Sequence, residues 1–254
     1  MYISAIIITK NEERNIERCL LSLQGIADEI VVVDSFSTDN TRKICEKYNV
    51  KFFSKEWLGY AEQKNSANLL STHDIVLSID ADEALSLELQ QSLLHLKSTE
   101  KQDFVCQINR LTNYCGKWIY HCGWYPDKKV RIFNRNKAKW QGEIHETVFY
   151  PIDTEVIPLK GDLLHYSYHS VEDHIKQVDK FTTLTAMEAF EKKENCTFFS
   201  LIIKSCWKFI RDYFFKRGFL DGYYGYLICK ISAFATFLKY VKLKQLHNQY
   251  AEKS

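Results

Sequence analysis

Three carboxylates stand within four positions, Asp80, Asp82 and Glu83, directly after the short apolar run of residues 77–79. Acidic residues stabilise the N-terminus of a helix, and a helix beginning near Ser86 would account well for Glu83. Asp80 fits that role poorly, because a carboxylate at the tip of a buried strand would be partly desolvated without a partner. Mg²⁺ and Mn²⁺ prefer carboxylate and phosphate oxygens, and they usually take only one or two protein carboxylates. The cluster therefore indicates a site for a divalent cation together with diphosphate oxygens.

A further acidic residue, Asp34, ends a second β-branched run, residues 29–34. A carboxylate in this place also binds a ribose hydroxyl in proteins that hold NAD or S-adenosylmethionine. Those proteins need a glycine-rich turn after the first strand, so that the backbone can approach a phosphate. The corresponding turn here, residues 9–13, reads Thr-Lys-Asn-Glu-Glu and contains no glycine. The sequence therefore argues against a dinucleotide site of that type.

The elements that must position these carboxylates alternate between strands and helices. Apolar β-branched runs predict strands at residues 3–8, 29–34, 50–53 and 74–79, and helical periodicity predicts helices that begin near residues 16, 41, 60 and 86. This alternation predicts a mostly parallel α/β sheet. Ligands of such sheets bind at the carboxyl ends of the strands. The polar residues that follow those ends are Thr9, Asn11, Glu12, Asp34, Asp39, Asp80 and Asp82. We therefore expect them to form one site.

Four segments in this order resemble the motifs of family 2 glycosyltransferases with the GT-A fold: residues 5–12 (AIIITKNE), 29–39 (EIVVVDSFSTD), 63–65 (QKN) and 80–83 (DADE). The resemblance continues through residues 114–146 and 215–243. It is strongest to the glucosyltransferases that act on heptose in lipopolysaccharide and lipooligosaccharide cores, which share residues 123–127 (GWYPD), 131–133 (RIF) and 144–146 (IHE). This resemblance implies a GT-A α/β fold, a mostly parallel sheet flanked by helices, followed by a helical C-terminal extension.

The resemblance also implies the residues of the donor site. Thr9, Asn11 and Glu12 would line the nucleotide pocket, and Asp34 would hold the uracil or ribose edge. Lys64 would approach the diphosphate, Asp80 would serve the donor ribose and the metal, and Asp82 would bind the Mg²⁺ or Mn²⁺ ion. Arg131 could reach the donor diphosphate or acceptor phosphates, since a guanidinium matches phosphate geometry. Two alternatives stay open: Lys64 as an exposed helix lysine, and His165 as a further metal ligand.

An inverting transferase needs a general base that takes the proton from the acceptor hydroxyl. Glu146 is our choice, because it occupies the place of the His-Glu motif of the resembling subgroup, while Asp127 and Glu143 are alternatives. Trp124, Tyr125 and Asp127 are candidates for contact with the acceptor. Aromatic residues in a strand-rich segment also serve as core, so that reading of Trp124 and Tyr125 stays open.

The C-terminal part of the chain is basic and aromatic. Residues 201–254 hold ten Lys and Arg, three Asp and Glu, and thirteen aromatic residues, although the whole chain has a formal net charge of only +2. Helices of this composition are typical of protein surfaces that lie in an anionic lipid leaflet. The alternative is a helical cap whose basic face is merely solvated. No recognition motif for nucleic acid accompanies the charge.

We expect a GT-A catalytic domain over residues 1–170, with a nucleotide-sugar-binding half at 1–100 and an acceptor-side half at 101–170, and a helical extension over 171–254. The expected activity is inverting transfer of a hexose, glucose from UDP-glucose, to a heptose of the lipooligosaccharide or lipopolysaccharide inner core. Alternatives are a family 2 enzyme with another acceptor, a polyprenyl-linked glycan or a peptide, and a nucleotide-sugar-binding protein without turnover.

The sequence also predicts a location. Its eight cysteines are scattered, most within apolar periodic stretches, where a reduced thiol packs as a small hydrophobe. The N-terminal residues 1–10 lack a basic segment, and no span reaches the roughly 18 apolar residues of a transmembrane helix. We expect a cytoplasmic protein that is peripheral on the cytoplasmic face of the inner membrane.

Overall fold

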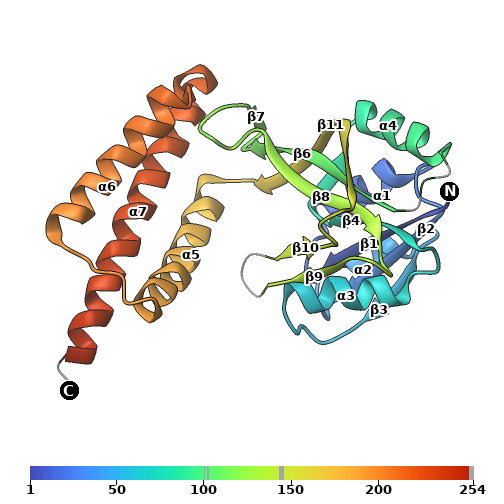
Figure 1. Ribbon diagram of the computed structural model, residues 1–254, viewed down its shortest axis with the longest axis horizontal. Coiled ribbons are helices and arrows are strands. Elements are labelled where there is room, and N and C mark those ends of the chain that lie inside the picture. The colour runs from blue at the N-terminus through green and yellow to red at the C-terminus, as the bar shows by residue number, and fades with distance from the viewer. Residues whose placement is uncertain (100, 102, 143–145, 252–254) are drawn as a thin grey trace. The chain divides into compact units, whose positions relative to one another are not determined.

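The computed structural model describes residues 1–99, 101, 103–142 and 146–251 (Figure 1). The chain forms two compact units. The first unit comprises residues 1–111 and 127–166, and the second comprises residues 112–126 and 167–254. The predicted residues of the donor site all belong to the first unit.

Four parallel strands form one half of the main sheet: β1 (Ile3–Thr9), β2 (Glu29–Asp34), β3 (Lys51–Ser54) and β4 (Ile75–Asp80), in the order β3-β2-β1-β4. All of β1 is buried, as a β-branched run covered on both faces requires. Thr9 pairs with Asp34, and Ile8 pairs with Asp80. This register places the predicted site residues of β1, β2 and β4 at the same level of one sheet edge.

Later strands extend the sheet beyond β4: β8 (Asp127–Asn134), β6 (Phe104–Tyr114), β11 (Glu155–Tyr168) and β5 (Glu83–Leu85), in that order, with β7 (Lys117–Ile119) paired to β6. The pairs β4–β8, β8–β6 and β11–β5 are antiparallel. A separate antiparallel pair joins β9 (Lys139–Gln141) to β10 (Thr147–Phe149). The α/β fold predicted from the sequence is therefore present, and its first four strands pair in parallel.

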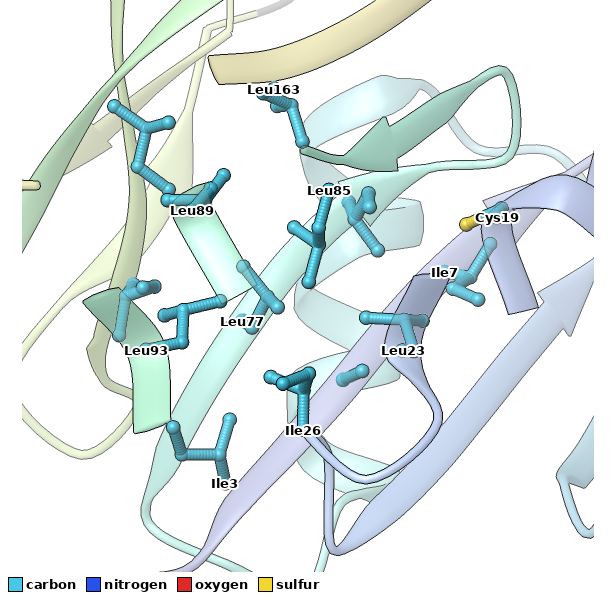
Figure 2. Packing of buried hydrophobic residues seen from close by; sticks show 14 of the residues in the cluster. Ile3, Ile7, Cys19, Leu23, Ile26, Leu77, Leu85, Leu89, Leu93 and Leu163 are labelled. Carbon is cyan, nitrogen blue, oxygen red and sulfur yellow. The ribbon is translucent and has the colours of Figure 1, made fainter. Parts of the chain in front are cut away.

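Helices of the first unit complete its core: α1 (Ile16–Leu23), α2 (Thr41–Cys45), α3 (Tyr60–Leu70) and α4 (Leu87–Lys97). The buried apolar side chains of α1, which are Ile16, Cys19, Leu20 and Leu23, lie at the spacing of one helix face, and Gly25, with φ of +74°, follows the end of the helix. Figure 2 shows Cys19 and Leu23 of α1 packed with Ile7, Leu77 and Leu85 of the strands. This packing fixes β4, and with it the position of the carboxylates that follow.

The second unit is mainly helical, with α5 (Val171–Glu191), α6 (Phe198–Ile210), the π-helical turn η1 (Arg211–Phe215), the 3-10 turn η2 (Gly218–Asp221) and α7 (Gly222–Ala251). Helix α7 packs against α5, α6 and both turns. Gly225 lets α7 approach η2, because an added Cβ there would lie 1.9 Å from the carbonyl oxygen of Gly218. In the part of the chain that the structure describes, no helix has the length and apolar character needed to cross a membrane.

Candidate functional site

A buried lysine joins two of the predicted site carboxylates. Lys64, on the inner face of α3, is only 2% exposed. Its Nζ lies 3.0 Å from Asp80 Oδ1 at the end of β4 and 3.0 Å from Glu146 Oε1. The exposed-helix alternative for Lys64 is therefore wrong: the side chain faces inward and bridges the strand tip to the segment that carries the predicted base.

The aromatic ring of Trp140 forms one wall around this lysine. Lys64 Nζ lies 4.4 Å from the ring centroid, a distance at which a cation is attracted to the ring face. The side chain of Asn65 clamps the backbone of Trp140, since its Nδ2 donates to the carbonyl oxygen and its Oδ1 accepts from the amide, both at 3.0 Å. Helix α3 thereby fixes β9 next to the site.

Arg131, from β8, is the second buried cation at the tip of β4. Its Nη2 donates to Asp80 Oδ2 at 2.9 Å and to Glu83 Oε1 at 2.7 Å. Glu83 is buried in β5 and also accepts from the amide of Asp80 at 2.9 Å. Arg110 Nη1 lies 3.7 Å from the same glutamate. Arg131 thus holds the strand tip and the following strand together.

The expectation that Glu83 stabilises the next helix is wrong. Helix α4 begins at Leu87, and its N-cap is Ser86, whose Oγ accepts from the amide of Leu89 at 3.2 Å. Glu83 points instead to Arg131 inside the protein. A buried ion pair is stable only while both charged partners are present. Glu83 is therefore a structural anchor of the site, because it is the buried partner of Arg131.

The cations decide the protonation of Asp80. Burial alone would raise the pKa of Asp80, but the charges of Arg131 and Lys64 and their hydrogen bonds outweigh it and hold the pKa well below its usual range. For Arg131 the balance has the opposite sign: burial would lower its pKa, and the charges of Asp80 and Glu83 raise it above its usual range. Asp80 is therefore a fixed, ionised acceptor.

Asp82 lies beside a histidine of the neighbouring strand. Its Oδ2 is 3.2 Å from His165 Nε2, because β11 pairs with β5 and places His165 opposite Glu83. The amide of Tyr166 donates to the carbonyl oxygen of Asp82 at 2.8 Å. Burial would raise the pKa of Asp82, but His165 more than offsets it, so the pKa lies below its usual value. His165, which the sequence left open as a further metal ligand, therefore lies beside the predicted metal ligand Asp82.

Asp82 and His165 suit a divalent cation as a pair of ligands. Carboxylate oxygen and imidazole nitrogen are both ligands of Mn²⁺-type ions, and phosphate oxygens of a nucleotide commonly complete such a site. Among the described residues there is no group of three or more His, Cys, Asp or Glu side chains that could hold a metal. Asp82 and His165 would supply two protein ligands to a cation bound there.

The loops after β1 and β2 are tied together by predicted site residues. Asn11, with φ of +56°, donates its amide to Ser37 Oγ at 2.8 Å and accepts from the amide of Thr38 at 2.8 Å. Asp34, which is buried, accepts from the amide of Ser37 at 2.8 Å. Thr9 Oγ1 is buried and has no hydrogen-bond partner among the described residues. Asn11 and Asp34 thus tie together the loops at this edge of the sheet, beside the buried hydroxyl of Thr9.

Glu12 couples this loop to the acidic tip. Burial raises its pKa to about 7, and repulsion by Asp82, Asp39 and Asp80 adds to that effect against a hydrogen bond from Asn15. Its carboxyl group therefore changes charge near neutral pH.

Other predicted residues have separate surroundings. Asp127 lies between Arg110 Nη2 at 2.7 Å and Lys129 Nζ at 3.1 Å. Glu143, the other alternative base, lies outside the described residues. Trp124 and Tyr125 belong to the second unit, where the Trp124 ring packs against Tyr114 and Tyr168 and the Tyr125 ring lies against Tyr120.

The structure thus brings together four of the predicted side chains: Lys64, Asp80, Arg131 and Glu146. Three neighbours of this group were not predicted as site residues: Glu83 as an anchor, Arg110 and Trp140. Their contacts depend on antiparallel pairing among distant strands, for which the sequence carries no signal. For Trp140, the sequence offers one signal of a place near the site, which is its position six residues before the predicted base Glu146.

Comparison with known proteins gives a consistent family. Residues 4–151 match the model of glycosyl transferase family 2. An uncharacterised glycosyltransferase of Rickettsia typhi is 34% identical over 254 residues, which cover 96% of this chain and 87% of the relative. The lipopolysaccharide core biosynthesis glycosyltransferase LpsC of Rhizobium meliloti is 29% identical over 257 residues, which cover 96% and 93% of the two chains.

Among solved structures, the chain is similar to S. aureus TarS 1–349 in complex with UDP. The TM-score is 0.47, and the two chains are 17% identical over 100% of this chain and 92% of that chain. The match to the family model covers more than half of the chain, and a relative above 30% identity covers nearly all of it. The GT-A fold predicted from the sequence is confirmed, and this chain belongs to glycosyl transferase family 2.

Proposed function

We propose that the chain is an inverting glycosyltransferase that transfers glucose from UDP-glucose to a heptose of the lipopolysaccharide or lipooligosaccharide inner core. The observation that carries this proposal is the Lys64 bridge, which places Asp80 and Glu146 on either side of one ammonium group. A donor-side carboxylate and a candidate base are thereby adjacent, as transfer between two substrates requires. The likeness to LpsC, named for lipopolysaccharide core biosynthesis, supports the acceptor class.

On the donor side, the edge formed by β1, β2 and β4 would receive the nucleotide. The free hydroxyl of Thr9 and the half-buried carboxylate of Asp80 offer hydrogen-bond partners for the uridine moiety. Asn11, Glu12 and Asp34 form the rest of this edge. We assign nucleotide-sugar binding to residues 1–100 on this basis.

The diphosphate carries negative charge that must be neutralised as UDP departs. Asp82 and His165 would hold a Mg²⁺ or Mn²⁺ ion, which when bound supplies electrophilic stabilisation of the leaving diphosphate. Lys64 and Arg131 add two buried positive charges beside the strand tip. These cations also keep Asp80 ionised, so that it can accept a hydrogen bond from a ribose hydroxyl.

Glu146 would act as the general base. Its carboxylate takes the proton from the acceptor hydroxyl while that oxygen attacks the anomeric carbon from the face opposite UDP. The new bond joins the acceptor oxygen to the anomeric carbon, and the bond from that carbon to the phosphate oxygen breaks, with its electron pair leaving on UDP. The Lys64 ammonium, 3.0 Å away, fixes the position of the Glu146 carboxylate.

The acceptor proposed here is a glycolipid. Trp124, Tyr125 and Asp127 are the residues that we assign to its sugars, within an acceptor-side half at residues 101–170. The extension at residues 171–254 would keep the protein on the cytoplasmic face of the inner membrane, where an anionic leaflet presents the growing core. The basic and aromatic composition of that extension supports this part of the proposal.

Release of UDP from UDP-glucose tests the proposal. The purified chain is assayed with Mg²⁺ or Mn²⁺, with and without purified heptose-containing core. We expect metal-dependent release that requires the core. Release that requires a polyprenyl-linked glycan or a peptide instead would refute the acceptor assignment. An absence of release with every acceptor would favour a nucleotide-sugar-binding protein without turnover.

A further inference from the structure

An apolar stripe lies on the outer face of α6 in the second unit. Phe199, Ile203, Trp207 and Ile210 follow one another at intervals of four, four and three residues, which places them on one side of a helix. All four are exposed. Leu201 lies on another face and is buried in the core that α6 forms with α7. These four side chains therefore remain exposed outside the core of this unit.

The stripe continues into exposed side chains of the turns η1 and η2. The centroid of the Phe215 ring lies 5.7 Å from the centroid of the Trp207 ring, and Phe215 is 69% exposed. Phe214 and Phe219 both contact the ring of Tyr213, at 5.1 and 6.2 Å. We call the exposed residues of these turns the aromatic tip: Phe214, Phe215, Phe219 and Leu220. An apolar patch of this kind on a folded chain indicates an interaction surface.

Cations accompany the stripe along its length. Lys204, Lys208 and Arg211 each follow a stripe residue directly, and Lys216 and Arg217 are exposed beside the aromatic tip. Lysine and arginine can lay their apolar stems on such a surface while the charged ends reach a polar phase. Apolar side chains and positively charged side chains therefore alternate along α6.

Negative charge is hidden from this surface. Between residues 198 and 251, all of which the structure describes, the carboxylates are Asp212 and Asp221, and both are buried. Asp212 pairs with Lys208 and Arg211, each at 2.8 Å, and Asp221 pairs with His121 at 3.0 Å. The exposed face of α6 and the turns therefore carries positive charge alone.

We propose that the stripe and the aromatic tip form a docking surface for an anionic lipid leaflet. Aromatic rings favour the headgroup depth of a bilayer, and flanking cations are attracted to acidic headgroups. A second copy of this chain is a poorer occupant, because a self-complementary interface would bring cations against cations. This inference deepens the proposed function, since it names the surface that would bring the enzyme to a lipid-linked acceptor.

Vesicle flotation with the full chain tests the docking surface without any turnover. One set of vesicles contains phosphatidylcholine and phosphatidylglycerol, and the other contains phosphatidylcholine alone. We expect binding to the anionic vesicles that weakens at high salt, and little binding to the neutral ones. Phe215→Ser/Phe219→Ser should lower the partition coefficient at least about tenfold, because both rings leave the interface. Arg217→Asn should lower it about fivefold.

Matched controls alter the same kinds of side chain on the first unit. Leu69→Ser/Ile152→Ser removes two exposed apolar residues, and Lys47→Asn removes one exposed cation. Both controls should bind as the wild-type chain does. Three results would overturn the proposal: a wild-type chain that stays unbound, tip variants that bind normally, or a dimer in solution that the tip variants dissociate and that ignores vesicles. UDP release with soluble core fragments reports on the proposed function separately.

Discussion

The ion pair between Arg131 and Glu83 makes a quantitative prediction for stability. Arg131→Met keeps most of the volume of the side chain but removes its charge, and it leaves the carboxyl group of Glu83, which is 1% exposed, without its nearest cation. Removing one partner of a buried pair destabilises a protein by 3–5 kcal/mol as a typical range, which is about 3 kcal/mol here because Arg110 remains 3.7 Å from Glu83. For a unit of this size, that loss lowers the melting temperature by roughly 6–12 °C.

Differential scanning calorimetry of the full chain measures this effect. The double variant Arg131→Met/Glu83→Gln should recover part of the loss, because the stranded charge is gone. A matched control is Lys47→Met, which removes an exposed cation and should change the melting temperature little. A melting temperature of Arg131→Met equal to that of the wild-type chain would contradict this prediction. A double variant that is less stable than Arg131→Met by the full effect of Glu83→Gln would contradict it too.

Two further predictions concern a buried histidine and the metal. Burial lowers the pKa of His174 to about 4, so the folded state favours the neutral ring. The free energy of unfolding should be highest above about pH 6.5 and should fall by at most about 3 kcal/mol as the pH drops to about 4. Chemical denaturation at several pH values measures this loss, and His174→Gln should largely remove it. Asp82→Asn should weaken Mn²⁺ binding in the presence of UDP at least about tenfold, measured by electron paramagnetic resonance of the free ion, and unchanged binding would contradict the ligand role of Asp82.

The parallel half of the fold was readable in the sequence because its strands are buried on both faces. Such strands appear as uninterrupted β-branched runs, and β1 and β2 lie within a residue of the predicted limits. The helices α1, α3 and α4 were readable for a similar reason, since their apolar spacing and end residues are local signals. Asp80 and Asp82 follow from these elements alone.

The surroundings of those carboxylates were not readable. Which strand pairs with β4 or β5 is decided by contacts between residues far apart in the chain, and these pairings bring Arg131 and His165 to the site. The role of Glu83 was also not predictable. An acidic residue shortly before a helix can stabilise the helix N-terminus or pair with a buried arginine, and the local sequence does not distinguish the two roles. Composition likewise identified the basic, aromatic extension but not the face that it exposes.

We propose Glu146, held by Lys64 beside Asp80, as the base of a heptose-directed transfer. The direct measurement is UDP release by Glu146→Gln in the presence of heptose-containing core, with binding of UDP-glucose followed by calorimetry. We expect turnover to fall about 10²–10⁴-fold with donor binding retained, while the control Glu46→Gln, which changes an exposed carboxylate of the first unit, keeps its turnover. Near-normal turnover by Glu146→Gln would contradict it and move the role of base to Asp127 or Glu143.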